Sequence, residues 1–483
     1  MSKKSIVRNS IYYLIYNVCN LFFPLISGVY VARKLSPESI GQVSYAQNIV
    51  QYFVIFALLG IPTYGIREIS NARKNQLELN RVYSELFIIN LLSTILFFLL
   101  YLILIFYFKS DSKTLILYFI VSIFLLANIF DINWLFEGLE EFKFISLRNV
   151  AFKVISFFLL VIFVRKPDDY LKFALINTLG TVGNYFINIL YAKKYVALTL
   201  KDLNFKRHIK SILYLVSVNL AIEIYTLVDV SMLGFFCVKE VVAYYVYGSR
   251  IYKILLQIIN SFTMVIVPRI SLLYAENRKE EFNVLLSQTF KIIILCAVPM
   301  IIGIQFTAKE LIVLLYGESY IHSVKIIQLM SILLVLTPVG YLLGSRVLLI
   351  SKHENKMVIA VVLGAVSNTL GNYFLIQKYA QLGAAISTTV SEILVMLVYV
   401  FLGRKYFKLI IEKNEYLKIV VSNMVMLLVL IIISNLKVKG NIILILEISL
   451  APIVYFCILF ICKEKYVYEK TIKLLKNKVM RVK

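Results

Sequence analysis

The sequence has few charged residues for its length and lacks the motifs that mark many enzymes. Only 16% of its 483 residues are Asp, Glu, Lys or Arg, whereas about 25% are charged in an average soluble protein. It contains no GxxxxGK[ST] phosphate loop, no HExxH metal motif and no GxGxxG nucleotide motif. No stretch between its apolar segments exceeds about twenty residues, so a separate catalytic domain has no room. These absences exclude an ordinary soluble fold and argue against an enzyme.

Residue types that build metal and catalytic sites are scarce and scattered. The five cysteines lie in or beside apolar segments without metal-ligand spacing, as small packing residues do. His208, His322 and His353 fall in expected loops without partners at useful spacing, so we expect them to be solvated. We expect Asp168 and Asp169 to form a solvated turn rather than a metal site. The sequence therefore predicts no cofactor and no metal.

Apolar residues dominate the sequence instead. They make up 60% of the chain, and the mean hydropathy is +0.83. Apolar runs of about twenty residues recur from end to end, each long enough to cross about 30 Å of hydrocarbon. The runs are continuously apolar, unlike the alternating strands of a membrane β-barrel. We predict an all-α polytopic membrane protein with about fourteen transmembrane helices, near residues 11–32, 42–63, 84–108, 114–135, 148–164, 170–192, 211–236, 241–267, 288–306, 323–345, 357–377, 382–403, 416–434 and 441–462.

The formal net charge of +24 could suggest a nucleic-acid-binding protein. Most of the Lys and Arg excess instead falls in short loops and a tail that would face the cytoplasm, where such charge sets topology. We therefore expect no nucleic acid partner, insertion in the cytoplasmic membrane, and both termini in the cytoplasm. The basic start resembles a signal peptide, but its apolar core is too long and lacks a cleavage site, so we expect a retained first span.

The longest internal loop follows the sixth predicted span and divides the chain. Short similar stretches end corresponding spans on its two sides, such as YAKKY (191–195) and LGRKYF (402–407). Parallel repeats of this kind occur in some transporters. We predict an N-terminal lobe (1–196), a basic cytoplasmic linker (197–210), a C-terminal lobe (211–406), and two further spans with a basic tail (407–483).

Polar residues follow one face of several predicted spans. In the eighth span, Arg250 and Lys253 lie about 14 and 18 Å from the outer end, and Gln257 and Asn260 continue their face. A cation facing lipid there would cost roughly 2.5–3.5 kcal/mol. We call Arg250, Lys253, Gln257 and Asn260 the stripe. The stripe must therefore face protein or water. Other candidates with polar spacing are Asn184 in span six, Asn219, Glu223 and Asp229 in span seven, and Glu392 near the middle of span twelve.

Two interpretations of these charges stay open. Glu223 and Lys253 lie at similar predicted depths, as do Asp229 and Arg250, so they could form ion pairs that join two spans. Amide stripes can likewise hold helices together. Several inward stripes with an excess of cations at one depth instead favour a wet, positively charged cavity. Such a cavity suits an anionic headgroup, because arginine grips phosphate oxygens well.

Two further arginines, Arg33 and Arg346, lie at the ends of predicted helices. Either could contact a headgroup or form part of a gate. Either could equally serve only to set the topology of its span.

Several motifs together resemble one family of membrane transporters. The stretch DINWLFEGLEEFK (131–143) resembles a hallmark of the Wzx-type oligosaccharide-lipid flippases. These proteins belong to the multidrug/oligosaccharidyl-lipid/polysaccharide exporter superfamily. The resemblance continues through residues 227–253, 267–271, 310–320 and 364–392, so it covers nearly the whole chain.

The resemblance implies two six-helix lobes in a V-shaped, alternating-access arrangement, with two further C-terminal helices. It implies translocation of undecaprenyl-pyrophosphate-linked oligosaccharide repeat units across the cytoplasmic membrane, coupled to an ion gradient. The product would serve capsule, O-antigen or exopolysaccharide synthesis. The implied partners are this lipid-linked oligosaccharide, membrane lipids, and a polymerase with other polysaccharide assembly proteins.

The resemblance also implies roles for particular residues. Cations of the lumen hold the pyrophosphate in such proteins, and Arg250, with Lys253 beside it, matches that role best. If protons drive the cycle, the carboxylates of interest are Glu223, Asp229 and Glu392. The remaining candidate headgroup contacts are Arg33, Asn219, Gln257 and Asn184.

Other functions stay open beside this one. A lipid II flippase of the same superfamily is the nearest alternative. A membrane polysaccharide polymerase or glycosyltransferase would need a sizeable loop with acidic or histidine residues, and the sequence offers none. A drug/cation antiporter is disfavoured because a cationic cavity repels cationic drugs.

Overall fold

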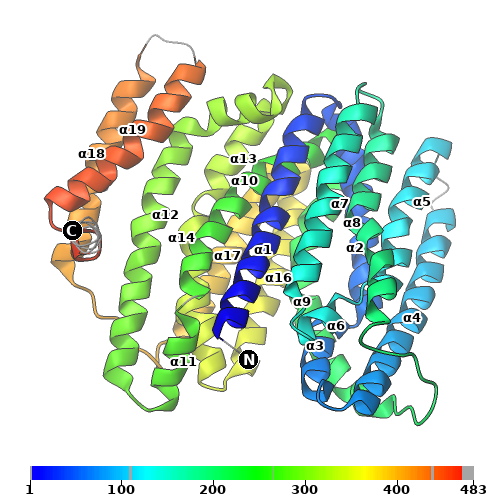
Figure 1. Cartoon of the computed structure of the whole chain (residues 1–483). Helices are drawn as coiled ribbons and strands as arrows, with labels where there is room; N and C mark the ends of the chain where they lie inside the picture. Colours follow the sequence, from blue (N-terminus) through cyan, green and yellow to red (C-terminus); the bar gives the residue numbers. More distant parts are fainter. Residues whose placement is uncertain (1–2, 108–110, 265, 437–439, 470–483) are drawn as a thin grey trace, which may run out of the picture. The chain divides into compact units, whose positions relative to one another are not determined.

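The computed structural model describes residues 3–107, 111–264, 266–436 and 440–469, with only the backbone at 3–11, 13, 214–224, 262 and 354. This part of the chain is helical and contains no strand (Figure 1). The all-α membrane fold predicted from the sequence is confirmed. By internal packing the chain forms two units, Met1–Ala243 and Tyr244–Lys483. The predicted lobe boundaries at 196 and 211 stay a prediction.

The helices of the first unit begin and end at local sequence signals. Pro37 opens the second helix after Ser36, whose Oγ accepts a hydrogen bond from the Ser39 amide at 3.2 Å. Asp111 caps the fifth helix in the same way. The elements are α1 (Lys3–Ala32), α2 (Pro37–Leu58), α3 (Ile61–Ala72), α4 (Gln76–Tyr107), α5 (Ser112–Ala127), η1 (Asn128–Phe130), α6 (Asn133–Gly138), α7 (Phe142–Phe163), α8 (Tyr170–Ala192), α9 (Lys206–Phe236) and the start of α10 (Lys239–Met264).

Two predicted spans of this unit are interrupted helices. The second turns at Leu59 and Gly60, whose φ angles of 50° and 68° are left-handed, before Pro62 starts α3. The fourth breaks at η1, and Asp131 Oδ1 accepts from the Asn133 amide at 3.3 Å. Aspartate favours such local hydrogen bonds over a continuous helix.

Two apolar cores of unit 1 lie within the described residues. One joins α2, α4, α5 and α8 through residues such as Val54 and Tyr101. The other joins α3, α4, α6 and α7 around Trp134. A Cβ at Gly65 would lie only 2.8 Å from the Trp134 ring, so α3 can approach α6 only with glycine there.

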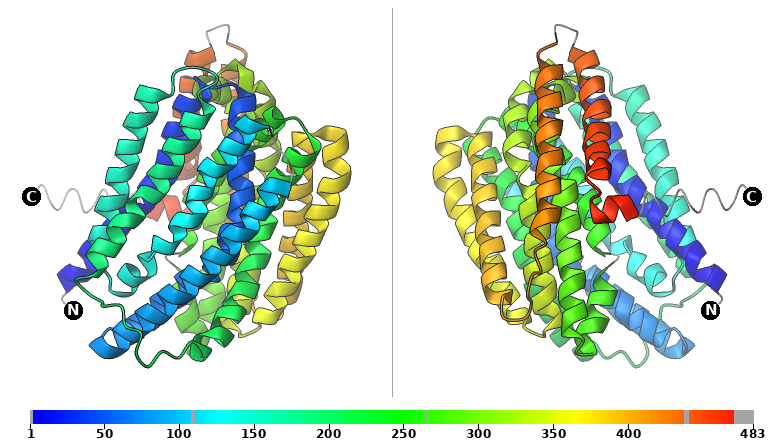
Figure 2. Two further views of the ribbon diagram at one scale, coloured as in Figure 1. Left: turned by 90° about the vertical axis from the view of Figure 1, so that its right-hand side faces the viewer. Right: turned by 90° about the vertical axis from the view of Figure 1, so that its left-hand side faces the viewer.

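The second unit begins within α10 and ends with a helical pair. Figure 2 shows α16 beside α17 and α18 beside α19, and both pairs pack along their length. Its further elements are α11 (Val267–Ala275), α12 (Lys279–Tyr316), η2 (Glu318–Ser323), α13 (Val324–Met330), α14 (Leu333–Gly340), the π-helix η3 (Tyr341–Arg346), α15 (Val347–Ile350), α16 (Glu354–Tyr379), α17 (Gln381–Gly403), α18 (Lys413–Ser434) and α19 (Gly440–Ile461).

Twelve candidate membrane spans occur among the described residues. They coincide with twelve of the predicted fourteen. The other two, 211–236 and 241–267, correspond to α9 and α10, of 31 and 26 residues. α10 is long enough to cross a bilayer, but charged and amide side chains lower its hydropathy.

The same pattern of hydrogen bonds holds a connecting segment against a helix in each unit. We call residues 196–205 and 404–412 the crossover segments. In unit 1, the Ala197 amide donates to Asn80 Oδ1 at 3.0 Å, and the Thr199 amide donates to Ser84 Oγ at 2.9 Å. In unit 2, the Lys408 amide donates to Asn283 Oδ1 at 2.9 Å, and the Ile410 amide donates to Ser287 Oγ at 2.8 Å. An Asn and a Ser four residues apart thus bind alternate backbone amides in both units.

A buried charge cluster anchors the first crossover segment. Glu85 is fully buried and accepts from the Asn204 amide at 2.6 Å. Its Oε2 lies 2.5 Å from Arg207 Nη2 and 2.6 Å from His208 Nε2. His208 Nδ1 contacts the Tyr64 hydroxyl at 2.8 Å. The expectation that His208 is solvated is therefore wrong, because α9 starts at Lys206 and turns the ring into the protein.

Candidate functional site

The polar stripe of α10 lies on one helical face, as its spacing predicts. Lys253 and Gln257 are exposed, while Arg250 and Asn260 are half-buried. Successive members are three or four residues apart, so their side chains follow one another along the helix axis. The stripe therefore presents two cations and two amides over about 15 Å of unit 2.

Arg250 is oriented by buried tyrosines. Its guanidinium carbon lies 4.6 Å from the centre of the Tyr247 ring, in a cation–π contact. Tyr247 is buried and packs edge-on against Tyr316, with 4.7 Å between ring centres, and against Tyr320 at 5.1 Å. The motif ELIVLLYGESY (310–320) supplies both supporting rings. The Arg250 guanidinium thus lies beside a cluster of packed aromatic rings.

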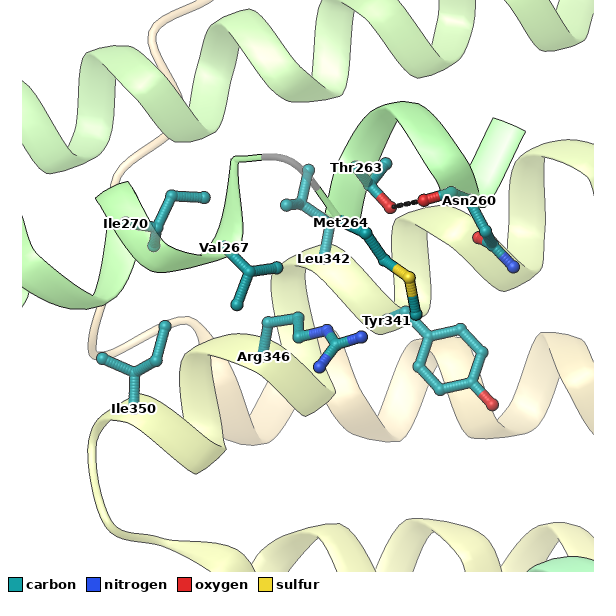
Figure 3. A pocket seen from close by; sticks show the side chains of 9 residues that line it. All are labelled: Asn260, Thr263, Met264, Val267, Ile270, Tyr341, Leu342, Arg346 and Ile350. Atoms are coloured by element: carbon teal, nitrogen blue, oxygen red, sulfur yellow. Dashed lines mark hydrogen bonds between the residues drawn. The ribbon is translucent and has the colours of Figure 1, made fainter. Parts of the chain in front are cut away.

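A cavity of about 280 Å³ lies at the end of this stripe, within unit 2. Figure 3 shows the Arg346 guanidinium, the Tyr341 ring and Asn260 toward one side of the cavity. Val267, Ile270 and Ile350 lie toward the other side. The cavity therefore has a polar end and an apolar end. Its remaining lining residues are Thr263, Met264 and Leu342.

Arg346 reaches this cavity because the helix around it is locally widened. Pro338 lies inside α14, and the π-helix η3 follows directly, with Arg346 as its last residue. A Cβ at Gly344 would lie 2.0 Å from Tyr399 Cβ, so η3 packs directly on α17 through that glycine. Single π turns of this kind are frequent at functional sites. Among the described residues, the half-buried Arg346 makes no hydrogen bond or ion pair.

Glu392 lies in the same unit as the stripe and the cavity. Its Oε2 accepts a hydrogen bond from Thr337 Oγ1 at 3.1 Å, which joins α17 to α14. Tyr341 lies within electrostatic reach of both Glu392 and Arg346. The structure thus gathers a predicted carboxylate, a predicted cationic stripe and Arg346 in unit 2.

The other predicted residues lie in unit 1. Asn184 is buried on α8, where its Nδ2 donates to the Thr181 carbonyl at 2.9 Å. Arg33 is exposed in the turn after α1. Asp229 is buried on α9, which packs against α2. The side chains of Asn219 and Glu223 lie outside the described part of the chain. The pairing of Asp229 with Arg250 and of Glu223 with Lys253 stays a prediction.

Sequence reasoning missed a buried cation in unit 1. Arg148 is only 6% exposed. Its Nη2 donates to Asn133 Oδ1 at 2.7 Å, and its guanidinium carbon lies 5.0 Å from the centre of the Phe144 ring. Asn133 is part of the DINWLFEGLEEFK motif, so this motif serves in part to hold Arg148. The only sequence signal was an arginine inside an apolar run, which does not indicate a partner.

Comparison with known proteins finds transporters among the proteins similar to this chain. A family model described as "Polysaccharide biosynthesis protein" matches residues 6–274. A putative O-antigen transporter of Shigella dysenteriae is 25% identical over 397 residues, covering 81% of this chain and 98% of that protein. The capsular polysaccharide biosynthesis protein CapF of Staphylococcus aureus is 22% identical over 419 residues, covering 83% and 100%.

A solved structure of similar fold covers nearly the whole chain. It is the lipid II flippase MurJ in an inward closed conformation, with a TM-score of 0.71 and 19% identity. The similarity covers 93% of this chain and 98% of that one. At this identity it shows a shared fold.

Proposed function

The chain belongs to the family of polysaccharide biosynthesis proteins, and we propose that it translocates a lipid-linked oligosaccharide across a membrane for surface polysaccharide assembly. It is a multi-pass membrane protein, and it acts as a transporter rather than an enzyme. The observation that carries the proposal is the stripe of α10, where Arg250 and Lys253 present positive charge on a helix that is long enough to cross a bilayer. A soluble sugar would not need these cations, whereas a lipid pyrophosphate does.

The finer proposal concerns the substrate and the path. The substrate is an undecaprenyl-pyrophosphate-linked repeat unit, and the membrane is the cytoplasmic one, with both termini in the cytoplasm. Lobes formed by residues 1–196 and 211–406 alternate access to the substrate, as the V-shaped arrangement of the resembling family implies. A polymerase and other assembly proteins receive the translocated product.

Arg250 and Lys253 hold the pyrophosphate in this proposal. A guanidinium can donate two parallel hydrogen bonds to phosphate oxygens, and the Tyr247 ring fixes its plane. Lys253 adds an ammonium about 4.5 Å further along the helix axis. Arg33, Asn184, Asn219 and Gln257 are further proposed contacts of the headgroup.

An ion gradient drives the cycle in this proposal. Glu392 is the carboxylate best supported, because Thr337 orients it and Arg346 lies in the same region of unit 2. Asp229 and Glu223 on α9 stay candidates. Replacing Glu392 with Gln would fix the neutral form, so we expect transport to become independent of the external pH.

The test uses a strain whose surface polysaccharide depends on this protein. We expect the double variant Arg250→Gln with Lys253→Gln to reduce surface polysaccharide at least ten-fold while the amount of folded protein is unchanged. The matched control is Arg269→Gln with Lys309→Gln, which removes two exposed cations from unit 2 away from the stripe. Unchanged export by the stripe variant would count against the site.

The same cells separate the proposal from its alternatives. Rescue of a cell depleted of its peptidoglycan flippase would favour lipid II as substrate, the alternative that the structural similarity to MurJ suggests. Formation of polymer by the purified protein, without translocation, would instead indicate a polymerase or glycosyltransferase.

A further inference from the structure

The cavity beside Arg346 has the chemistry of a site for a lipid phosphate. Four polar side chains line it: those of Arg346, Asn260, Tyr341 and Thr263 (Figure 3). The Thr263 Oγ1 donates to the Asn260 carbonyl at 2.9 Å, whereas the side chains of Arg346, Asn260 and Tyr341 have no hydrogen-bond partner among the described residues. A half-buried cation without a partner is costly, because desolvation is not repaid by a counter-charge. A ligand anion would repay it.

Arg346 differs in this respect from several other cations of the chain. Lys291 lies 2.9 Å from the buried Glu464, and Arg207 contacts both Glu85 and Glu78. Lys153 donates to the side chain of Asn20. Each of these charges has a partner supplied by the fold, and no cavity is needed to explain it. Arg346 has no such hydrogen-bond or ion-pair partner among the described residues, and its side chain borders a cavity.

The opposite end of the cavity is apolar. Val267 and Ile270 come from α11 and Ile350 from α15, so two elements line this end with aliphatic side chains. An inorganic anion would use only the polar end. A phosphate attached to an aliphatic chain would fill both ends, with the charge at Arg346 and the first carbons of the chain at Ile270 and Ile350.

The size of the cavity limits the ligand. At about 280 Å³ it is just below the ~300 Å³ at which ordinary small-molecule sites begin. It can take a phosphate or pyrophosphate with the start of an aliphatic chain, and it is too small for an oligosaccharide repeat unit as well. The sugar must therefore lie elsewhere when this cavity is filled.

Asn260 links the cavity to the stripe. It is the last member of the α10 stripe and also lines the cavity. Arg250 is ten residues earlier on α10, about 15 Å along the axis. Arg346 and Arg250 therefore mark two successive positions along one face of unit 2 at which a phosphate could bind.

We propose that the Arg346 cavity is a binding site for the phosphate end of a polyprenyl (pyro)phosphate, with the first prenyl carbons in its apolar half. The inference rests on the proposed function, because that function supplies the polyprenyl carrier. With both termini in the cytoplasm, as proposed, the Arg346 cavity lies nearer the cytoplasm than Arg250 does. The carrier therefore reaches Arg346 before the stripe.

The test measures binding of geranyl diphosphate, a short soluble analogue, to the purified full-length protein by titration calorimetry. We expect binding by the wild type and a roughly 10- to 100-fold weaker affinity for Arg346→Gln, which removes a charge-assisted hydrogen bond. Arg346→Lys should retain part of the affinity. Arg269→Gln removes an exposed cation of the same unit outside the cavity, and its affinity should equal that of the wild type.

Two probes separate the possible sources of the phosphate. Inorganic pyrophosphate tests the polar end alone and should bind more weakly than geranyl diphosphate. Phosphatidylglycerol tests an ordinary membrane lipid and should not compete with geranyl diphosphate. Equal competition by this lipid would overturn the assignment to a polyprenyl carrier. Equal affinity of Arg346→Gln and wild type would overturn the site.

A further variant addresses the apolar half. Ile350→Asn should weaken geranyl diphosphate and leave pyrophosphate unchanged, and thermal unfolding shows whether each variant is folded. If reconstituted wild type translocates a lipid-linked oligosaccharide and Arg346→Gln does so at the same rate, the cavity is wrong and the proposed function stands. If the wild type translocates none, the proposed function itself fails.

Discussion

Arg207 and Arg346 both lie near helix ends, but their surroundings differ. Arg207 Nη1 lies 2.5 Å from Glu78, and its Nη2 lies 2.5 Å from the fully buried Glu85. Arg346 borders a cavity of about 280 Å³ and has no charged partner among the described residues. The first charge is balanced by the fold, whereas the second is left for a ligand. Counting arginines in a membrane sequence does not separate these two uses; the position of the nearest carboxylate does.

The largest effect on stability should come from the buried cluster of Glu85, Arg207 and His208. Glu85→Gln removes the carboxylate that faces Arg207 and His208, and it leaves a buried site without its negative charge. Breaking a buried pair typically costs about 3–5 kcal/mol. Thermal unfolding in detergent should show this loss. Glu78→Gln is the matched control, because Glu78 is partly exposed and its pair is worth about 0–1 kcal/mol. Equal losses of stability in the two variants would show that the buried carboxylate of Glu85 contributes no more than the partly exposed one of Glu78.

Arg346→Gln should behave in the opposite way. Its guanidinium has no partner to lose, so the free energy of unfolding should change by about 0.5 kcal/mol or less. Transport in reconstituted vesicles should nevertheless fall at least ten-fold. Arg207→Gln serves as the counterpart, with lowered stability and a transport rate per folded molecule close to that of the wild type. A stability loss in Arg346→Gln comparable to that in Arg207→Gln would show that Arg346 is structural.

The two crossover segments should show smaller and similar effects. Asn80→Ala and Asn283→Ala each remove one acceptor for a backbone amide. A hydrogen bond of this kind contributes about 0.5–1.5 kcal/mol. Asn80 lies next to the Glu85 cluster, which already anchors its segment, so we expect no larger loss there. Thermal unfolding of both single variants, with Asn414→Ala as an exposed control, measures the difference.

The smallest effect belongs to an exposed turn before α8. The Lys172 ammonium, 2.7 Å from Asp169, and the amides of Arg165 and Lys166 hold the pKa of the Asp169 carboxyl well below its usual range. A lowered folded-state pKa contributes stability above the unfolded pKa of about 3.9, and this stability is lost as the pH falls. Unfolding of wild type and Asp169→Asn should therefore differ by below about 1 kcal/mol at pH 7.

The difference should shrink as the pH is lowered through about 4 toward acid. Stability curves of the two proteins between pH 7 and pH 3 measure it. A difference that grows on acidification would contradict the sign of the shift.

The fold was largely predictable because a bilayer imposes strong constraints. Continuous apolar runs must be helices when lipid surrounds them, so the helical class and most span positions follow from hydropathy. The interruptions at Gly60 and Asp131 were not predicted, since both lie inside apolar runs whose average hydropathy hides a single turn. The π-helix that presents Arg346 has no sequence signal beyond Pro338 and Gly344 nearby.

The candidate site was predictable only along one helix. Helical periodicity places Arg250, Lys253 and Gln257 on one face, and the structure retains that face. The cavity was not predictable, because it depends on α10, α11, η3 and α15 meeting in space. His208 was assigned to solvent because its partners, Glu85 and Tyr64, are more than a hundred residues away in the sequence.

The most direct test of the central claim is translocation by purified protein in vesicles. A fluorescent polyprenyl-pyrophosphate oligosaccharide, placed in one leaflet, should reach the other with the wild type and with the control variant Arg269→Gln. It should stay in place with Arg250→Gln combined with Lys253→Gln, although that variant is folded. Transfer by the double variant at the wild-type rate would contradict the account.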